Sequence, residues 1–281
     1  MQQFRPGGFN ILPPLVKNLL IINGLFFLAT ITFSSAFNID LYKIFGLHFP
    51  GAMDFRPYQF LTYLFMHGGF THLFFNMFAL WMFGNVLENV WGAKRFLIYY
   101  LVTGFGAAII HYAILYVEML PTLQQVNALL QDPDHESLKS FLQSENFKVS
   151  SMEIQNNLRN FLERYNSLIN SSPNEAMVEA INFLNQYKVD FLNAPVVVGA
   201  SGAVFGILLA FGMLFPNSLI YVFFAIPVKA KYFVMIYGAM ELYFGITTRG
   251  GGSNVAHFAH LGGMIFGYLM IKYWQSKERR F

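Results

Sequence analysis

Long apolar segments separated by short polar ones dominate the pattern of the chain. Six segments approach the length of about 20 apolar residues that a helix needs to cross the hydrocarbon core of a bilayer. They run at about 19–37, 70–86, 96–117, 196–215, 232–246 and 255–274, and part of the apolar stretch 219–228 is expected at the membrane interface. We therefore predict an all-α, polytopic membrane protein with six transmembrane helices.

One long polar block interrupts this pattern between the third and fourth segments. Residues 120–194 hold nine acidic and five basic side chains, and Ser150-x-x-Glu153 and Ser172-x-x-Glu175 both have the form of a helix-capping box. We predict a small helical insertion outside the bilayer, between membrane-core segments 1–119 and 195–281. Its role as a solvated spacer or as a platform for a substrate or partner stays open.

Composition and charge agree with this organisation. Charged residues are 12% of the chain, about half the share usual in soluble domains, and hydrophobic residues are 55%. Without cysteine, disulfides and Cys-ligated metal centres are excluded. Lys and Arg gather at both termini and in the loops after the second and fourth segments, which predicts a cytoplasmic location for both termini and an external insertion. Residues 1–17 lack the features of a cleaved signal peptide, so no cleaved targeting segment is expected.

Several polar residues are expected at one depth of the membrane. Counting from the external face, the second, fourth and sixth helices bring His72, Asn76, Ser201, His257 and His260 to a similar level. Polar side chains there are costly unless they face a bundle interior or a watered cavity. A serine at a helix N-terminus with a histidine nearby suits acyl transfer, because the histidine activates the hydroxyl and the free N–H groups bind an oxyanion.

Each feature alone also has a purely structural interpretation. Small residues around a serine in a membrane helix usually form a packing face, and Gly263-x-x-x-Gly267 is a close-packing motif in either case. The pair His257-x-x-His260, without a neighbouring carboxylate in sequence, is a weak zinc signal. Glu241 is expected to face the bundle in a protonated or backbone-bonded form, with no role in catalysis. Because the serine, the histidines and the asparagine are all expected at one depth, we favour a catalytic site without a metal over these structural interpretations.

The motifs at these positions resemble those of the rhomboid family of intramembrane serine proteases. The resemblance lies in four segments in the family's order: HLFFN at 72–76, the glycine- and glutamate-containing turn at 84–96, GASG at 199–202, and AHLGG at 259–263 continuing to Gly267. It implies a six-helix bundle around a water-filled cavity, and hydrolysis of peptide bonds in or near the transmembrane segments of single-pass proteins by a Ser–His dyad.

The resemblance also assigns roles to individual residues. Ser201 would be the nucleophile and His260 the general base. The backbone N–H of Ser201 and the side chains of His72 and Asn76 would form the oxyanion hole. Phe205, four residues after Ser201, would support the His260 ring, and Gly199 and Gly202 would allow close approach to the hydroxyl. The family often has tyrosine at position 205 and Trp-Arg where this chain has Phe55-Arg56, and it lacks so long an insertion.

The expected surroundings follow from the same resemblance. The partners would be transmembrane protein substrates and the lipid bilayer, without nucleic acid, metal or cofactor, and the location a bacterial plasma membrane. Independently of the resemblance, the glycines within residues 247–254 favour a flexible cap over the cavity in the external loop between the fifth and sixth spans. The alternatives are a rhomboid-like pseudoprotease that binds clients without cleaving them, and a transporter, although the chain has no inverted repeat. Covalent labelling of Ser201 by a fluorophosphonate would distinguish the enzyme from both.

Overall fold

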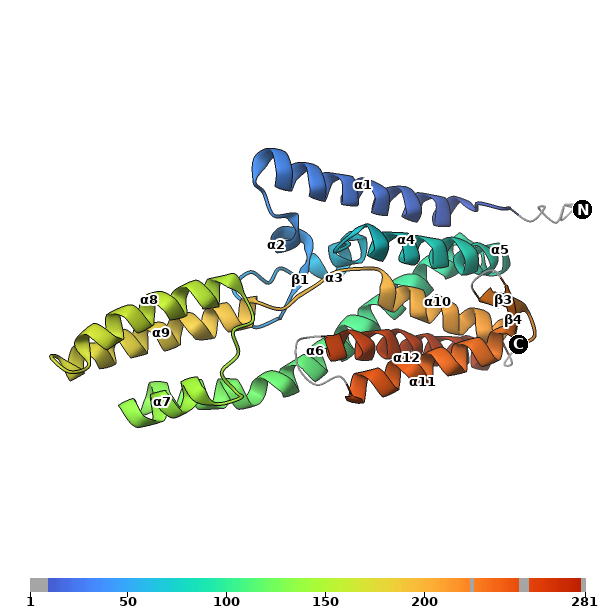
Figure 1. Cartoon of the computed structure of the whole chain (residues 1–281). Coiled ribbons are helices and arrows are strands. Elements are labelled where there is room, and N and C mark those ends of the chain that lie inside the picture. The colour runs from blue at the N-terminus through green and yellow to red at the C-terminus, as the bar shows by residue number, and fades with distance from the viewer. Residues whose placement is uncertain (1–9, 223–224, 248–252, 279–281) are drawn as a thin grey trace, which may run out of the picture. The chain divides into compact units, whose positions relative to one another are not determined.

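The computed structural model describes residues 10–222, 225–247 and 253–278 (Figure 1). Its elements are almost entirely helical. They divide into two compact units: one comprises Met1–Leu47, Pro57–Tyr112 and Val197–Phe281, and the other His48–Arg56 and Ala113–Val196. Each unit is described by itself.

The first unit contains most of the apolar helices. In chain order its elements are α1 (Pro14–Phe37), α2 (Leu41–Phe45), α3 (Gln59–Thr62), the 3₁₀ turn η1 (Tyr63–Phe65), α4 (Phe70–Ala79), the π-helical turn η2 (Leu80–Gly84), α5 (Asn85–Trp91), the first half of α6 (Ala93–Gln131), α10 (Ser201–Leu214), β3 (Leu219–Val222), β4 (Ile226–Lys229), α11 (Ala230–Thr247) and α12 (Ser253–Glu278). The short strands β1 (Leu47–His48) and β2 (Val196–Val197) lie where the chain passes between the units.

A buried carboxylate helps to define where the first helix begins. The side chain of Glu88, on α5, accepts hydrogen bonds from the backbone N–H groups of Leu15 and Val16 at 2.9 and 2.7 Å. These N–H groups have no partner within α1, because the first turn of a helix leaves its donors free. A negative charge is also favourable at a helix N-terminus. Glu88 therefore joins α5 to the start of α1.

Three helical segments among the described residues are long and apolar enough to cross a membrane: Pro14–Phe37, Phe70–Trp91 and Ala93–Gln131. The fourth predicted span is shorter than expected, because residues 196–197 form a strand and α10 begins only at Ser201. Its 14 residues extend about 21 Å, less than a hydrocarbon core of about 30 Å. The count of six spans remains a prediction.

Two short strands, residues 219–222 and 226–229, pair before α11. Strands β3 and β4 are antiparallel, with Leu219 opposite Lys229 and Val222 opposite Ile226. Branched and aromatic side chains such as Ile220 and Tyr221 are typical of strands. These strands account for the apolar stretch that precedes the fifth predicted span.

The second unit has a helical core of its own. It comprises the second half of α6 with α7 (His135–Gln143), α8 (Met152–Leu168) and α9 (Pro173–Asn193), and α8 packs along α9 (Figure 1). Phe161 of α8 and Phe183 of α9, both about 5% exposed, stack with centroids 4.4 Å apart. Helix α6 continues through residue 120 with Pro121 inside it, so no break in the helix marks the predicted start of the insertion.

The helix caps in this unit differ from the predicted capping boxes. The N-cap of α8 is Ser151, not Ser150, and its hydroxyl accepts from the backbone N–H of Ile154. Ser172 is the N-cap of α9, followed by Pro173 at the first position, but its side chain makes no capping hydrogen bond. Sequence spacing located both helix starts but not the hydrogen bonds, since a one-residue shift changes which hydroxyl reaches the free N–H groups.

Candidate active site

The chain enters α10 through a backbone conformation that glycine favours. Gly199 has φ +114°, and its N–H donates to the carbonyl of Tyr63 at 2.9 Å. A Cβ at this position would lie 2.6 Å from Cε1 of His72, too close for any side chain. Gly199 therefore lets the backbone pass directly against the His72 ring, and Ser201 follows as the first residue of α10.

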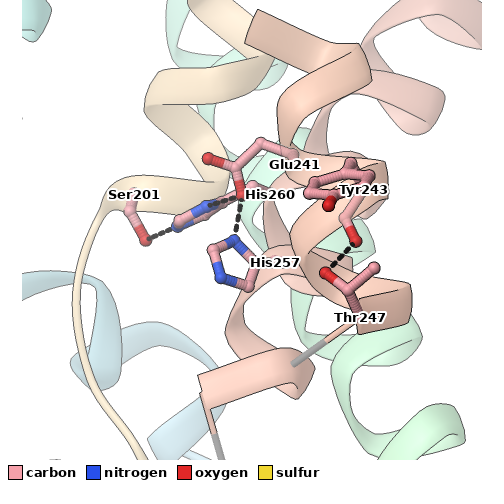
Figure 2. Close-up of polar contacts among 6 residues, drawn as sticks. All are labelled: Ser201, Glu241, Tyr243, Thr247, His257 and His260. Carbon is pink, nitrogen blue, oxygen red and sulfur yellow. Dashed lines mark hydrogen bonds and ion pairs between the residues drawn. The ribbon is translucent and has the colours of Figure 1, made fainter. Parts of the chain in front are cut away.

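Ser201 and His260 meet across two helices far apart in the sequence. The Nε2 atom of His260, on α12, lies 3.0 Å from Oγ of Ser201 (Figure 2). The helices approach closely because Gly263 has no side chain where α12 meets the backbone of Gly202: a Cβ on Gly263 would meet the carbonyl group of Gly202, only 2.7 Å from its carbon. The structure thus brings together a hydroxyl and a base at hydrogen-bond distance.

The His260 ring lies against aromatic side chains. Phe205, one turn after Ser201 on α10, stacks on it with centroids 4.1 Å apart and planes within 5°. Tyr237 of α11 stacks on Phe205 in turn, at 5.2 Å and 12°. These contacts restrict the orientation of the imidazole, and the contact of Phe205 is the one that the resemblance implies.

His72 and Asn76 occupy the same face of α4. The Nδ1 atom of His72 accepts a long hydrogen bond, 3.4 Å, from the N–H of Gly68, so its Nε2 carries the proton. His72 is also close enough to His260 for the two rings to interact electrostatically. Asn76 is buried, and its amide donates one hydrogen bond to the carbonyl of His72 at 3.0 Å, which leaves its second N–H for another acceptor.

Glu241 is a site residue that the sequence reasoning missed. Its Oε2 atom lies 3.0 Å from Nδ1 of His260 and 2.6 Å from Nδ1 of His257 (Figure 2). Glu241 is buried, as expected, but the hydrogen bonds of its Oε2 atom go to two histidine rings and not to the backbone. The missed signal was helix counting: Glu241 lies six residues before the end of α11 and His260 seven after the start of α12, and equal distances from a short connection place residues at one depth.

Glu241, His257 and His260 also have the residue types of a metal site. These three described residues each offer one ligand atom, and the three atoms lie within 4.8 Å of one another. Ligands held at about 2.0–2.1 Å around a tetrahedral zinc ion would be about 3.3 Å apart. The two N–O distances are shorter and match hydrogen bonds between ring N–H groups and a carboxylate.

The glycines of α12 face two different helices. Gly263 lies against α10, at the backbone of Gly202. A Cβ on Gly262 would meet Ile110 of α6 at 2.8 Å, and one on Gly267 would meet the Tyr99 ring of α6 at 3.2 Å. Residues 262 and 263 differ by about 100° around the helix, which turns them towards different neighbours.

One further expectation concerns the segment that follows α11. Most of the predicted cap at 247–254 lies outside the described residues, and the structure places Thr247 at the end of α11, where its hydroxyl donates to the carbonyl of Tyr243 (Figure 2). Arg56, in the second unit, donates to the backbone carbonyls of Met53 and Phe55.

Known proteins that are similar to this chain belong to the family whose motifs the site resembles. The model of the Rhomboid domain family matches residues 54–123 and 176–276, which is more than half of the chain. Over 52 residues the chain is 40% identical to "Rhomboid protease GluP" of Bacillus subtilis (strain 168). That stretch covers 18% of this chain and 10% of the relative, so the chain spans about a tenth of the length of the curated relative it matches. With the family model covering both the helices of the site and their motifs, this integral membrane protein belongs to the rhomboid family.

Proposed function

We propose that the protein is an intramembrane serine endopeptidase that uses Ser201 as nucleophile and His260 as general base. The observation that carries the proposal is the 3.0 Å contact between Ser201 Oγ and His260 Nε2. A serine hydroxyl is a weak nucleophile until an adjacent base accepts its proton. Here the base lies at the required distance, with its ring held by Phe205.

The reaction begins with attack on a peptide carbonyl. As Ser201 Oγ bonds to the carbonyl carbon, its proton passes to Nε2 of His260, and the carbonyl oxygen becomes an oxyanion. The backbone N–H of Ser201 is free because it belongs to the first turn of α10, and the positive end of the helix dipole favours the negative charge. The Nε2–H of His72 and the second amide N–H of Asn76 are the side-chain donors proposed for the same oxygen.

The later steps use the same base in both directions. The imidazolium of His260 gives its proton to the departing amine, which breaks the peptide bond and leaves an ester on Ser201. His260 then accepts a proton from a water molecule that attacks this ester, and it returns the proton to Ser201 Oγ as the acid is released. Every proton is carried by side chains of this chain, so the proposed chemistry includes no metal or cofactor.

The proposed substrates are single-pass membrane proteins cleaved in or near their transmembrane segments. Support comes from family membership and from the apolar helices around the site. The Ser–His pair lies in the first unit, among helices α10, α11 and α12. The proposal includes six membrane spans, cytoplasmic termini and an external insertion, in a bacterial plasma membrane.

Reconstitution in liposomes with a transmembrane substrate tests the proposal. Ser201→Ala should remove both cleavage and fluorophosphonate labelling while the protein stays folded, because the change deletes one hydroxyl. The matched control is Ser276→Ala on α12, whose exposed hydroxyl only donates to the carbonyl of Tyr273. Cleavage by Ser201→Ala near the wild-type rate would refute the proposal, and a folded wild-type protein that neither labels nor cleaves would favour the pseudoprotease.

A further inference from the structure

Glu241 is a buried carboxylate in contact with the proposed general base. It lies on α11, only 7% exposed, in a helix otherwise rich in apolar side chains. A charged group in such surroundings is costly unless it is paired, and its partners here are both histidines of α12. We propose that Glu241 is a positioning residue that completes a Ser201–His260–Glu241 triad, an inference that rests on the proposed function.

The first argument concerns the proton on His260. Its two ring nitrogens have different partners: Nε2 lies 3.0 Å from Ser201 Oγ and Nδ1 lies 3.0 Å from Glu241 Oε2. An ionised carboxylate only accepts hydrogen bonds, so the hydrogen must be on Nδ1. Nε2 is then free to accept the serine proton. Glu241 therefore selects the tautomer that can act as a base.

The second argument concerns charge. When Nε2 takes up the serine proton, the ring becomes an imidazolium whose Nδ1–H already points at a negative oxygen. Both groups are at most about one-fifth exposed, so water screens the attraction less than it would at the surface. The carboxylate thus stabilises the protonated ring that forms as the oxyanion forms.

The third argument concerns how Glu241 itself is held. His257 Nδ1 lies 2.6 Å from the same Oε2 atom, which is a short hydrogen bond from a ring N–H to a carboxylate. This second donor fixes the carboxylate on the side of α11 that faces α12. Through this hydrogen bond His257 supports the base by way of Glu241.

The decisive variant is Glu241→Gln, which keeps the size of the side chain. A glutamine can turn its NH₂ group towards Nδ1 and so favour the tautomer with hydrogen on Nε2, which cannot accept the serine proton. The equivalent change in a well-studied triad lowers kcat by about 10⁴. We expect kcat to fall by about 10²–10⁴ with KM within about threefold of wild type, and fluorophosphonate labelling to slow in parallel.

The pH profile separates positioning from a structural role. Without the carboxylate the protonated ring is less stable, so the acidic limb of kcat/KM should move to lower pH in Glu241→Gln. The other titratable groups around the pair are His257, His72 and Tyr237. None of them is changed in this variant. A structural role alone would lower thermal stability and leave the limb in place.

Glu88→Gln is the matched control. Glu88 is also buried, 4% exposed, and accepts two N–H hydrogen bonds, but from the backbone of α1 and away from Ser201. Its replacement should lower the melting temperature while kcat and the pH profile stay unchanged. Glu241→Asp keeps the charge and should recover part of the turnover that Glu241→Gln loses.

The outcomes separate this inference from the proposed function. If Ser201→Ala and His260→Ala abolish cleavage but Glu241→Gln turns over within about threefold of wild type, the triad is refuted and the protease proposal stands. If Ser201→Ala still cleaves, the protease proposal itself fails. A change in wild-type activity on treatment with a chelator, absent in Glu241→Gln, would overturn the inference in favour of a metal-binding Glu241.

Discussion

The contact between Gly202 and Gly263 predicts a large effect of a single methyl group. In Gly263→Ala the new Cβ would clash first with the carbonyl oxygen of Gly202, and it would lie 2.7 Å from the carbonyl carbon and 3.3 Å from Cα of the same residue. Carbon atoms in ordinary contact are about 3.5–4.0 Å apart. The obstacle is helix backbone and not the end of a flexible side chain, so α10 and α12 must separate by about 1 Å.

That separation would act directly on the proposed catalytic pair, Ser201 and His260. Gly202 follows Ser201, and Gly263 lies one turn after His260. The 3.0 Å hydrogen bond between Ser201 Oγ and His260 Nε2 would therefore lengthen to about 4 Å. A misplacement of about 1 Å can cost about 10²-fold in rate. Overpacking of this kind costs about 1–3 kcal/mol of folding free energy. We expect kcat to fall about 100-fold with a moderate loss of thermal stability.

Turnover in liposomes and melting temperature, measured on the same preparation, test this reasoning. The matched control is Gly238→Ala on α11, where the new Cβ would meet the terminal methyl group of Met264 at 3.2 Å. That flexible side chain can move away, so turnover should change little. Wild-type turnover in Gly263→Ala, or an equal loss in both variants, would show that helix spacing at Gly202 does not control the Ser201–His260 distance.

Three further predictions address other parts of the molecule. Asn76→Ala should lower kcat by up to about 10²–10³ and leave KM unchanged, because an oxyanion donor acts in the transition state; a change in KM alone would contradict this role. His260→Ala should eliminate cleavage and fluorophosphonate labelling while His257→Ala keeps a substantial fraction of both, and the reverse result would exchange their assignments. Phe161→Ala should destabilise the second unit by about 3–5 kcal/mol, detected as faster limited proteolysis of residues 132–193, without changing the labelling rate of Ser201.

Much of the site follows from local spacing in the sequence. His72 and Asn76 share a helix face because they are four residues apart, and Phe205 lies one turn after Ser201 for the same reason. The spacing places Phe205 on the helix face of Ser201, whereas its stack on His260 was implied only by the family resemblance. The apolar pattern likewise located helices at 14–37, 70–91 and 93–131, although it placed the end of the last one too early.

Other features depend on how the helices pack. The sequence alone shows Glu241 in one apolar segment and His257 and His260 in another, and each of these residues could have a purely structural role. Their 2.6 and 3.0 Å contacts exist because α11 and α12 pack side by side with matching depth and rotation. The split of Gly262 and Gly263 between α6 and α10 has the same origin. Periodicity determines which residues share a face of one helix, but the partner of that face is determined by long-range packing, which no local pattern encodes.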